Sequence, residues 1–214
     1  MILNHTVDII VGLVVGAILL AIIIYLIVIY KNNPCGGCAH AKQCKSAKKM
    51  SKALLVIDMQ EACVGKNHAE FFKYDSDIIT KVNEEIKANE NVIYIRNLMK
   101  KNLINKLAPV QIFDGDKGAE LAEDLLKKGN AVFDKYKGDA FSNPQLLEHL
   151  QENSIDTVEV VGVDGGGCVA LTALGAIENG FKVIVNTKAT GTMFEKKKDK
   201  YFQMLEKKGA TFIG

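Results

Sequence analysis

The chain has 214 residues, of which 48% are hydrophobic and 24% charged, and its formal net charge is +2. That balance is ordinary for a globular protein, and the length allows one good-sized domain with appendages. The positive charge is concentrated in one short segment, residues 31–52, which suits an anionic lipid surface and not a nucleic acid.

After a short segment at 1–8, residues 9–30 form an unbroken run without a charge. At 1.5 Å per residue this run is long enough to cross a bilayer core of about 30 Å, so it predicts a transmembrane helix. A cleaved secretory signal would need a basic stretch before the run, and a buried core helix would carry a polar face. Gly12 and Gly16 form a G-x-x-x-G pair that can pack two such helices, although such pairs also arise by chance.

A polar neck at 31–52 follows, with six lysines, whereas nothing basic precedes the apolar run. The positive-inside rule therefore predicts a single-pass protein of the cell membrane whose C-terminal part is cytoplasmic. The alternative for the lysines themselves is a solvated spacer that touches no lipid.

The neck also contains the pattern C-x-x-C-x-H-x-x-x-C, formed by Cys35, Cys38, His40 and Cys44. This spacing can hold a metal or an iron-sulfur cluster, but it lacks the usual distant second half. The span and neck together resemble small Cys-rich membrane proteins associated with ferrous-iron transport. A reduced linker with free thiols is the other interpretation.

In the body, residues 53–214, short β-branched runs alternate with amphipathic helical patterns. We expect strands at 53–57, 91–95, 131–133, 157–163, 182–185 and 211–213, and helices at 77–89, 118–128, 144–153, 169–179 and 195–207. This alternation predicts an α/β fold, a Rossmann-like three-layer sandwich with a mainly parallel sheet. Active sites in such sheets lie at the carboxyl ends of the strands.

Three reactive side chains follow expected strands. Asp58 ends the first strand, Lys135 the third, and Cys168 follows the fourth after three glycines, at the start of a helix. Each has an ordinary interpretation as well, as a helix cap, a solvated lysine or a small buried residue. Neither G-x-G-x-x-G nor a P-loop matches the glycine run, which argues against a nucleotide site.

Together these residues suggest nucleophilic catalysis. The amides and positive end of a helix are expected to stabilise the Cys168 thiolate and a developing oxyanion, and Asp58 is available to take the thiol proton.

The segments ALLVIDMQ, KYKGDAF and VVGVDGGGCVALTALGAIENGFKV resemble the three signature segments of the isochorismatase-like hydrolase superfamily, in the same order. The resemblance implies that Asp58, Lys135 and Cys168 form a catalytic triad. It also implies a cis peptide between Val163 and Asp164, with the amides of Asp164 and Cys168 as oxyanion donors. Lys137 is the rival to Lys135, but its spacing to the following Ala-Phe pair departs from the family pattern.

Nicotinamidases of this superfamily bind a metal through Asp and His residues after the second strand, but residues 96–109 contain neither. We therefore expect no catalytic metal and no cofactor. A cysteine nucleophile favours cleavage of an amide or related C–N bond in a small molecule, with Gln60 and Phe141 expected to contact it. Cys63 is either a resolving thiol or, more simply, a small buried residue.

A second hypothesis is a non-catalytic or redox- and metal-linked accessory module tethered to a membrane transporter. Homo-oligomerisation and substrate identity are left open.

Overall fold

The computed structural model describes residues 20, 22–25 and 51–214, and residues Met50–Gly214 form a compact unit of their own. The expected span at 9–30 and the neck cysteines lie wholly or mostly outside the described residues. Within the described residues, no helix is long and apolar enough to cross a membrane.

A six-stranded sheet forms the centre of this unit, with the order β3-β2-β1-β4-β5-β6 and parallel pairing throughout. Its strands are β1 (Ser51–Ile57), β2 (Val92–Asn97), β3 (Val132–Lys135), β4 (Ile155–Val163), β5 (Lys182–Gly191) and β6 (Thr211–Ile213). All six expected strands are present, so the predicted α/β class is confirmed. Lys52, which the sequence assigned to the neck, lies in β1 and pairs with the buried Glu159.

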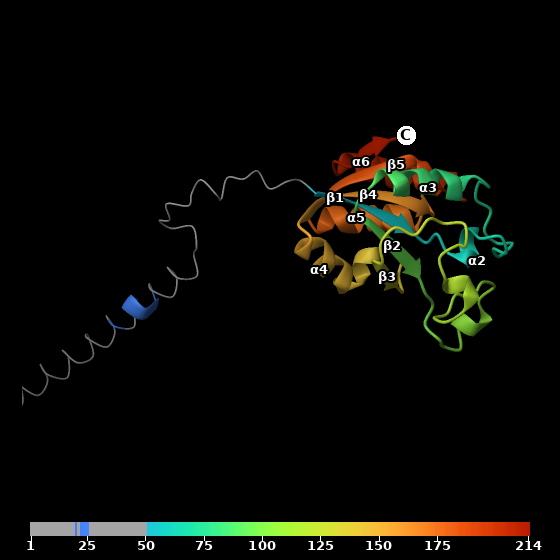
Figure 1. Ribbon diagram of the computed structural model, residues 1–214, viewed down its shortest axis with the longest axis horizontal. Helices are drawn as coiled ribbons and strands as arrows, with labels where there is room; N and C mark the ends of the chain where they lie inside the picture. Colours follow the sequence, from blue (N-terminus) through green and yellow to red (C-terminus); the bar gives the residue numbers. More distant parts are fainter. Residues whose placement is uncertain (1–19, 21, 26–50) are drawn as a thin grey trace, which may run out of the picture. The chain divides into compact units, whose positions relative to one another are not determined.

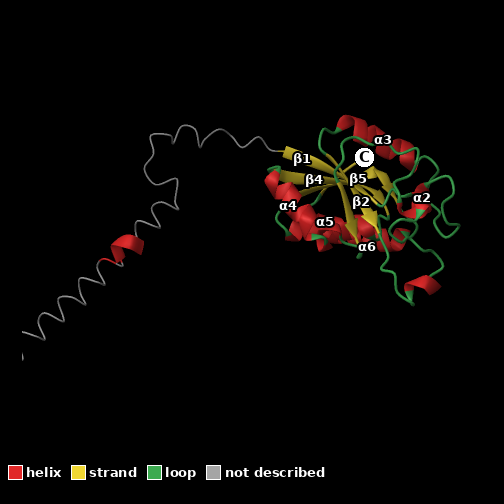
Figure 2. Ribbon diagram, turned by 60° about the horizontal axis from the view of Figure 1, so that its bottom comes forward, coloured by secondary structure: helices red, strands yellow, loops and turns green. Residues whose placement is uncertain are grey.

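Helices cover both faces of the sheet (Figures 1 and 2). One face packs against α4 (Pro144–Glu152), α5 (Cys168–Glu178) and α6 (Glu195–Lys207). The other packs against α2 (Glu61–Val64), α3 (Ile78–Ala88) and the connection between β2 and β3. Because β1 and β4 are central and buried on both faces, they are continuous apolar runs, as is typical of parallel sheets.

The helix expected at 118–128 is wrong. A 3-10 turn, Lys117–Ala119, is followed by an irregular segment whose backbone bonds to the chain after β1: Glu61 N–H donates to Glu120 O, and Ala122 N–H to Met59 O. Ala119, Ala122 and Leu125 are buried at helix-like spacing. Tertiary hydrogen bonds replace the helical ones here, so the apolar period alone was misleading. The rest of the β2–β3 connection includes another 3-10 turn, Asn105–Leu107, and runs away from the sheet (Figure 1).

The chain order reverses between β1 and β4, which makes the space beyond their carboxyl ends the topological switch point. Gly162, in β4, allows the two strands to meet there, since its φ is +110° and a Cβ would lie 2.2 Å from the carbonyl oxygen of Ile57. Any side chain at this position would separate the strands that carry Asp58 and the Cys168 loop.

Candidate active site

Asp58, Lys135 and Cys168 meet at this switch point, although they come from three separate strand ends. Lys135 Nζ lies 3.0 Å from Asp58 Oδ2 and 3.1 Å from Cys168 Sγ. Asp58 is 4% exposed and Lys135 is 1% exposed. The sequence expectation that these three side chains come together is therefore matched by their geometry.

Asp58 is held by an unusual backbone conformation directly after β1. Its φ is +54°, a left-handed value that few non-glycine residues adopt, and its N–H donates to Ile95 O. The Oδ1 atom of its carboxylate is buried and has no hydrogen-bond partner among the described residues. Such an acceptor is costly unless something uses it, and the Cys168 thiol interacts with this carboxylate.

The charges of this trio follow from burial and from each other. Burial raises the pKa of Asp58 above its ordinary value, and the nearby Lys135 ammonium offsets this in part. Burial acts to lower the pKa of Lys135, but Asp58 and Cys168 outweigh it, so the net direction is upward. The resting site therefore contains a lysine ammonium beside a carboxylate of increased basicity.

The pKa of the Cys168 thiol differs in direction from the sequence expectation of a stabilised thiolate. Burial, followed by repulsion from the Asp58 carboxylate, raises the pKa of Cys168 to about 12. Cys168 begins α5, and the nearby Lys135 lowers the pKa of the thiol, but Lys135 does not outweigh these two effects. Cys168 is thus a neutral thiol at rest and needs a base to become a nucleophile.

The loop before Cys168 has a fixed shape. The cis peptide expected between Val163 and Asp164 is present. The Asp164 carboxylate accepts hydrogen bonds from Gly166 N–H and Met193 N–H, and Val169 N–H donates to Asp164 O. The amide of Cys168 is in the first turn of α5, where an N–H has no acceptor within the helix.

A cavity of about 180 Å³ opens onto Asp58 and Cys168. Its walls include the apolar or aromatic side chains of Phe72, Tyr74, Ile112, Met193 and Phe194, and also Cys63, Asn97 and Lys197. Sequence reasoning did not identify these wall residues as functional, except for the remark on Cys63. Asn97 could have been found because it ends β2, by the same rule that selected Asp58; Phe72 and Tyr74 come from an irregular stretch without a pattern.

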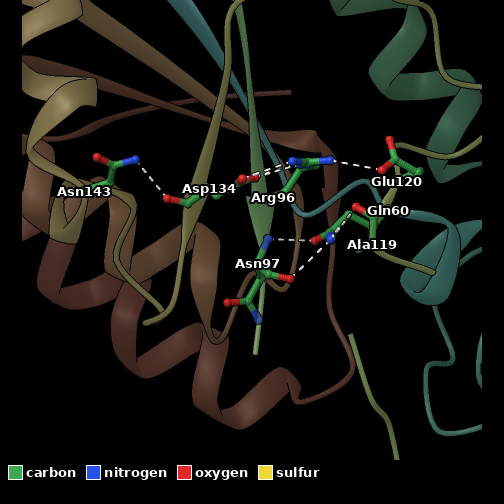
Figure 3. A network of polar contacts seen from close by, with 7 residues as sticks. All are labelled: Gln60, Arg96, Asn97, Ala119, Glu120, Asp134 and Asn143. Atoms are coloured by element: carbon green, nitrogen blue, oxygen red, sulfur yellow. Dashed lines mark hydrogen bonds and ion pairs between the residues drawn. The ribbon is translucent and has the colours of Figure 1, made fainter. Parts of the chain in front are cut away.

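Gln60 and Phe141, which the sequence suggested as substrate contacts, are not among the residues that line this cavity. Gln60 is fully buried, and its amide binds main chain: Asn97 N–H donates to Gln60 Oε1, and Gln60 Nε2 donates to the carbonyls of Asn97 and Ala119 (Figure 3). Phe141 packs on the core and contacts Phe181, at 5.7 Å between ring centroids. Gln60 is instead a clamp on the end of β2. The Asn97 side chain points away from this clamp (Figure 3) and lines the cavity.

A second network joins β2 to β3, near the same edge (Figure 3). Arg96 makes a two-pronged contact with Asp134, at 2.7 and 3.0 Å, and also reaches Glu120. Asn143, the N-cap of α4, donates to Asp134 O. Because Lys135 follows Asp134 directly, these contacts fix the strand end that presents the lysine.

The rival lysine, Lys137, is exposed and lines a different and larger hollow of about 430 Å³. Cys63 is buried in the wall of the 180 Å³ cavity as a free thiol, and burial raises its pKa.

The residues at the end of β2 do not fit a catalytic metal. In this part of the chain Arg96 is a cation and Asn97 an amide, and no Asp or His occurs from 96 to 109. Among the residues that the structure describes, no three His, Cys, Asp or Glu side chains gather to hold an ion.

Comparison with known proteins now identifies the class. The sequence model of the isochorismatase domain matches residues 52–214. The chain therefore belongs to the isochorismatase family and is a hydrolase of that family.

Solved structures agree with this fold. A pyrazinamidase/nicotinamidase from Streptococcus mutans is 25% identical, with a TM-score of 0.66 over 76% of this chain and 100% of the other. A pyrazinamidase of Pyrococcus horikoshii in complex with zinc is 23% identical, with a TM-score of 0.65 over 76% of this chain and 98% of the other. An N-carbamoylsarcosine amidase from Thermoplasma acidophilum is 22% identical, with a TM-score of 0.62 over 76% and 95%. No curated protein matches significantly.

Proposed function

We propose that the protein is a cysteine-dependent amidohydrolase that cleaves a small carboxamide through a thioester on Cys168. The observation that supports it is the position of the Lys135 ammonium, 3.0 Å from Asp58 and 3.1 Å from Cys168, beside a small cavity. The names of the similar structures, nicotinamidase, pyrazinamidase and N-carbamoylsarcosine amidase, agree with an amide substrate.

In the proposed reaction the Cys168 thiol gives its proton to the unpartnered Oδ1 of Asp58, and the sulfur adds to the amide carbon. The carbonyl oxygen becomes an oxyanion and is bound by the N–H groups of Asp164 and Cys168. Asp58 then passes its proton to the departing nitrogen, which leaves ammonia and a thioester. Water, deprotonated by Asp58, releases the carboxylic acid and restores the thiol.

Lys135 keeps Asp58 ionised despite burial and offsets the negative charge that appears on sulfur. The raised pKa of the thiol, about 12, makes this base essential, because very little thiolate exists at neutral pH without it.

The test is a thioester trap. The protein is incubated with nicotinamide, pyrazinamide and a panel of smaller carboxamides. The reaction is quenched in acid, and the mass of the intact protein is measured by mass spectrometry. We expect a transient acyl mass on Cys168 and release of ammonia, both lost in Cys168→Ala, while Cys63→Ala keeps the acyl mass. If Cys168→Ala releases ammonia at the full rate, the mechanism is wrong.

The proposal includes attachment to the cell membrane through residues 9–30, with the catalytic unit cytoplasmic. Its support is the uncharged apolar run and its one-sided lysine flank. A chain that begins at Met50 should move from the membrane fraction to the supernatant with kcat unchanged. Recovery of the full chain in the supernatant would contradict attachment.

A further inference from the structure

The walls of the 180 Å³ cavity have one charged side chain that nothing in the reaction uses, Lys197 near the start of α6. Asp58 is paired with Lys135, and Asp164 accepts from Gly166 and Met193. The neighbouring Lys198 pairs with Glu195. In the described part of the chain, by contrast, Lys197 has no acidic partner.

The rest of the cavity is small and mainly apolar. Its volume is below the roughly 300–1,000 Å³ of pockets for drug-sized ligands, so the substrate has few atoms. Phe72, Ile112 and Met193 offer surfaces for a short apolar body. Cys63 and Tyr74 add no charge, because burial raises the pKa of both groups.

We propose that the substrate is a small carboxamide that carries a carboxylate at its other end, and that Lys197 is the residue that recognises this carboxylate. The inference rests on the proposed amidohydrolase function and goes further by naming the substrate class. The amide carbon lies at Cys168, the short apolar body lies along the aromatic walls, and the carboxylate lies against the Lys197 ammonium at the exposed rim.

The experiment compares two substrates of equal length, succinamate and butanamide, which differ in a carboxylate and a methyl group. Wild type is expected to prefer succinamate by about tenfold in kcat/KM, since the contact joins two full charges at a partly dry site. Lys197→Ala should remove this preference through KM with little change in kcat, and Lys197→Glu should reverse it. Rising salt should raise KM for succinamate alone.

Lys196→Ala is the matched control, because this residue is adjacent and exposed but does not line the cavity. It should keep the wild-type preference. Equal use of both substrates by wild type, or a preference that survives Lys197→Ala, overturns the inference while leaving the amidohydrolase function intact.

Failure of the proposed function itself is recognised separately, as the absence of ammonia release from every carboxamide. In that case calorimetric binding of succinamate to Cys168→Ala, with and without Lys197→Ala, still decides the recognition. Binding that is equal in both variants overturns it.

Discussion

Two hollows, one lined by the end of β3 and one by the residues that follow β1 and β4, differ in what their walls contain. The larger, of about 430 Å³, is lined by Lys100, Asp134, Lys135, Tyr136 and Lys137. Its charges are either exposed or already paired, Asp134 with Arg96 and Lys135 with Asp58. The smaller, of about 180 Å³, includes Asp58 and Cys168, with Lys135 hydrogen-bonded to both. The volume of a hollow therefore does not identify an active site. An active site is better identified by buried titratable groups that shift each other's pKa.

The largest expected effect comes from Lys135→Met, compared with Lys137→Met two residues away. Loss of Lys135 leaves the Asp58 carboxylate buried without a partner, which should lower the free energy of unfolding by about 3–5 kcal/mol. We expect kcat/KM to fall about a thousandfold. Lys137→Met should change stability by less than about 0.5 kcal/mol, since Lys137 is exposed. Urea unfolding and initial rates measure both.

If Lys135→Met does not fold, the double variant Asp58→Asn/Lys135→Met removes both buried charges and should regain stability but no activity. Equal effects of the Lys135 and Lys137 substitutions would contradict the proposed role of Lys135 beside Asp58 and Cys168.

The next effect concerns pH. Burial raises the pKa of Asp58 above its ordinary value of 3.8, and the reaction needs the carboxylate form. Activity should therefore fall as the pH falls through this raised pKa, so the midpoint of the acid limb of kcat/KM should lie above the ordinary carboxyl value. Asp134→Asn, in the larger hollow, should leave the midpoint of that limb in place. A midpoint at or below the ordinary carboxyl value would exclude Asp58 as the base.

A smaller effect distinguishes the thiol from a preformed thiolate. Because burial and the Asp58 charge raise the pKa of Cys168 to about 12, iodoacetamide should react slowly at pH 7 and faster up to pH 10 without a plateau. Asp58→Asn removes the negative neighbour, so it should increase this alkylation rate about severalfold while abolishing turnover. Fast, pH-independent alkylation of wild type would restore the idea of a helix-stabilised thiolate.

The smallest effect tests the clamp on β2. Gln60→Ala leaves Asn97 N–H and the carbonyls of Asn97 and Ala119 without their partner, which should cost about 1–3 kcal/mol. KM should rise, since Asn97 lines the cavity, while the acid limb stays fixed. Gln111→Ala is the matched control: this exposed glutamine bonds one carbonyl, that of Lys106, and its loss should be near neutral. An unchanged KM in Gln60→Ala would mean that Asn97 plays no part in binding.

The sequence predicted the strands, four of the helices and the three residues that meet at the candidate active site. Short β-branched apolar runs predicted all six strands. The helices α3, α4, α5 and α6 were expected within about a residue at each end, because their apolar periods match the faces they bury. Asp58, Lys135 and Cys168 were candidates because parallel strands bring their carboxyl ends to one edge, and the resemblance to the isochorismatase-like hydrolase superfamily is what joined them as a triad.

Tertiary structure alone decided the rest. The segment at 118–128 has a helical apolar period, but its N–H and C=O groups bond to the chain after β1, and no local pattern encodes that exchange. Gln60 and Phe141 have chemistry suited to a ligand, yet packing turns one to the main chain and the other to the core. The protonation state of Cys168 also depends on the folded structure, since burial and the distance to Asp58, which set its pKa, exist only once the strands have assembled.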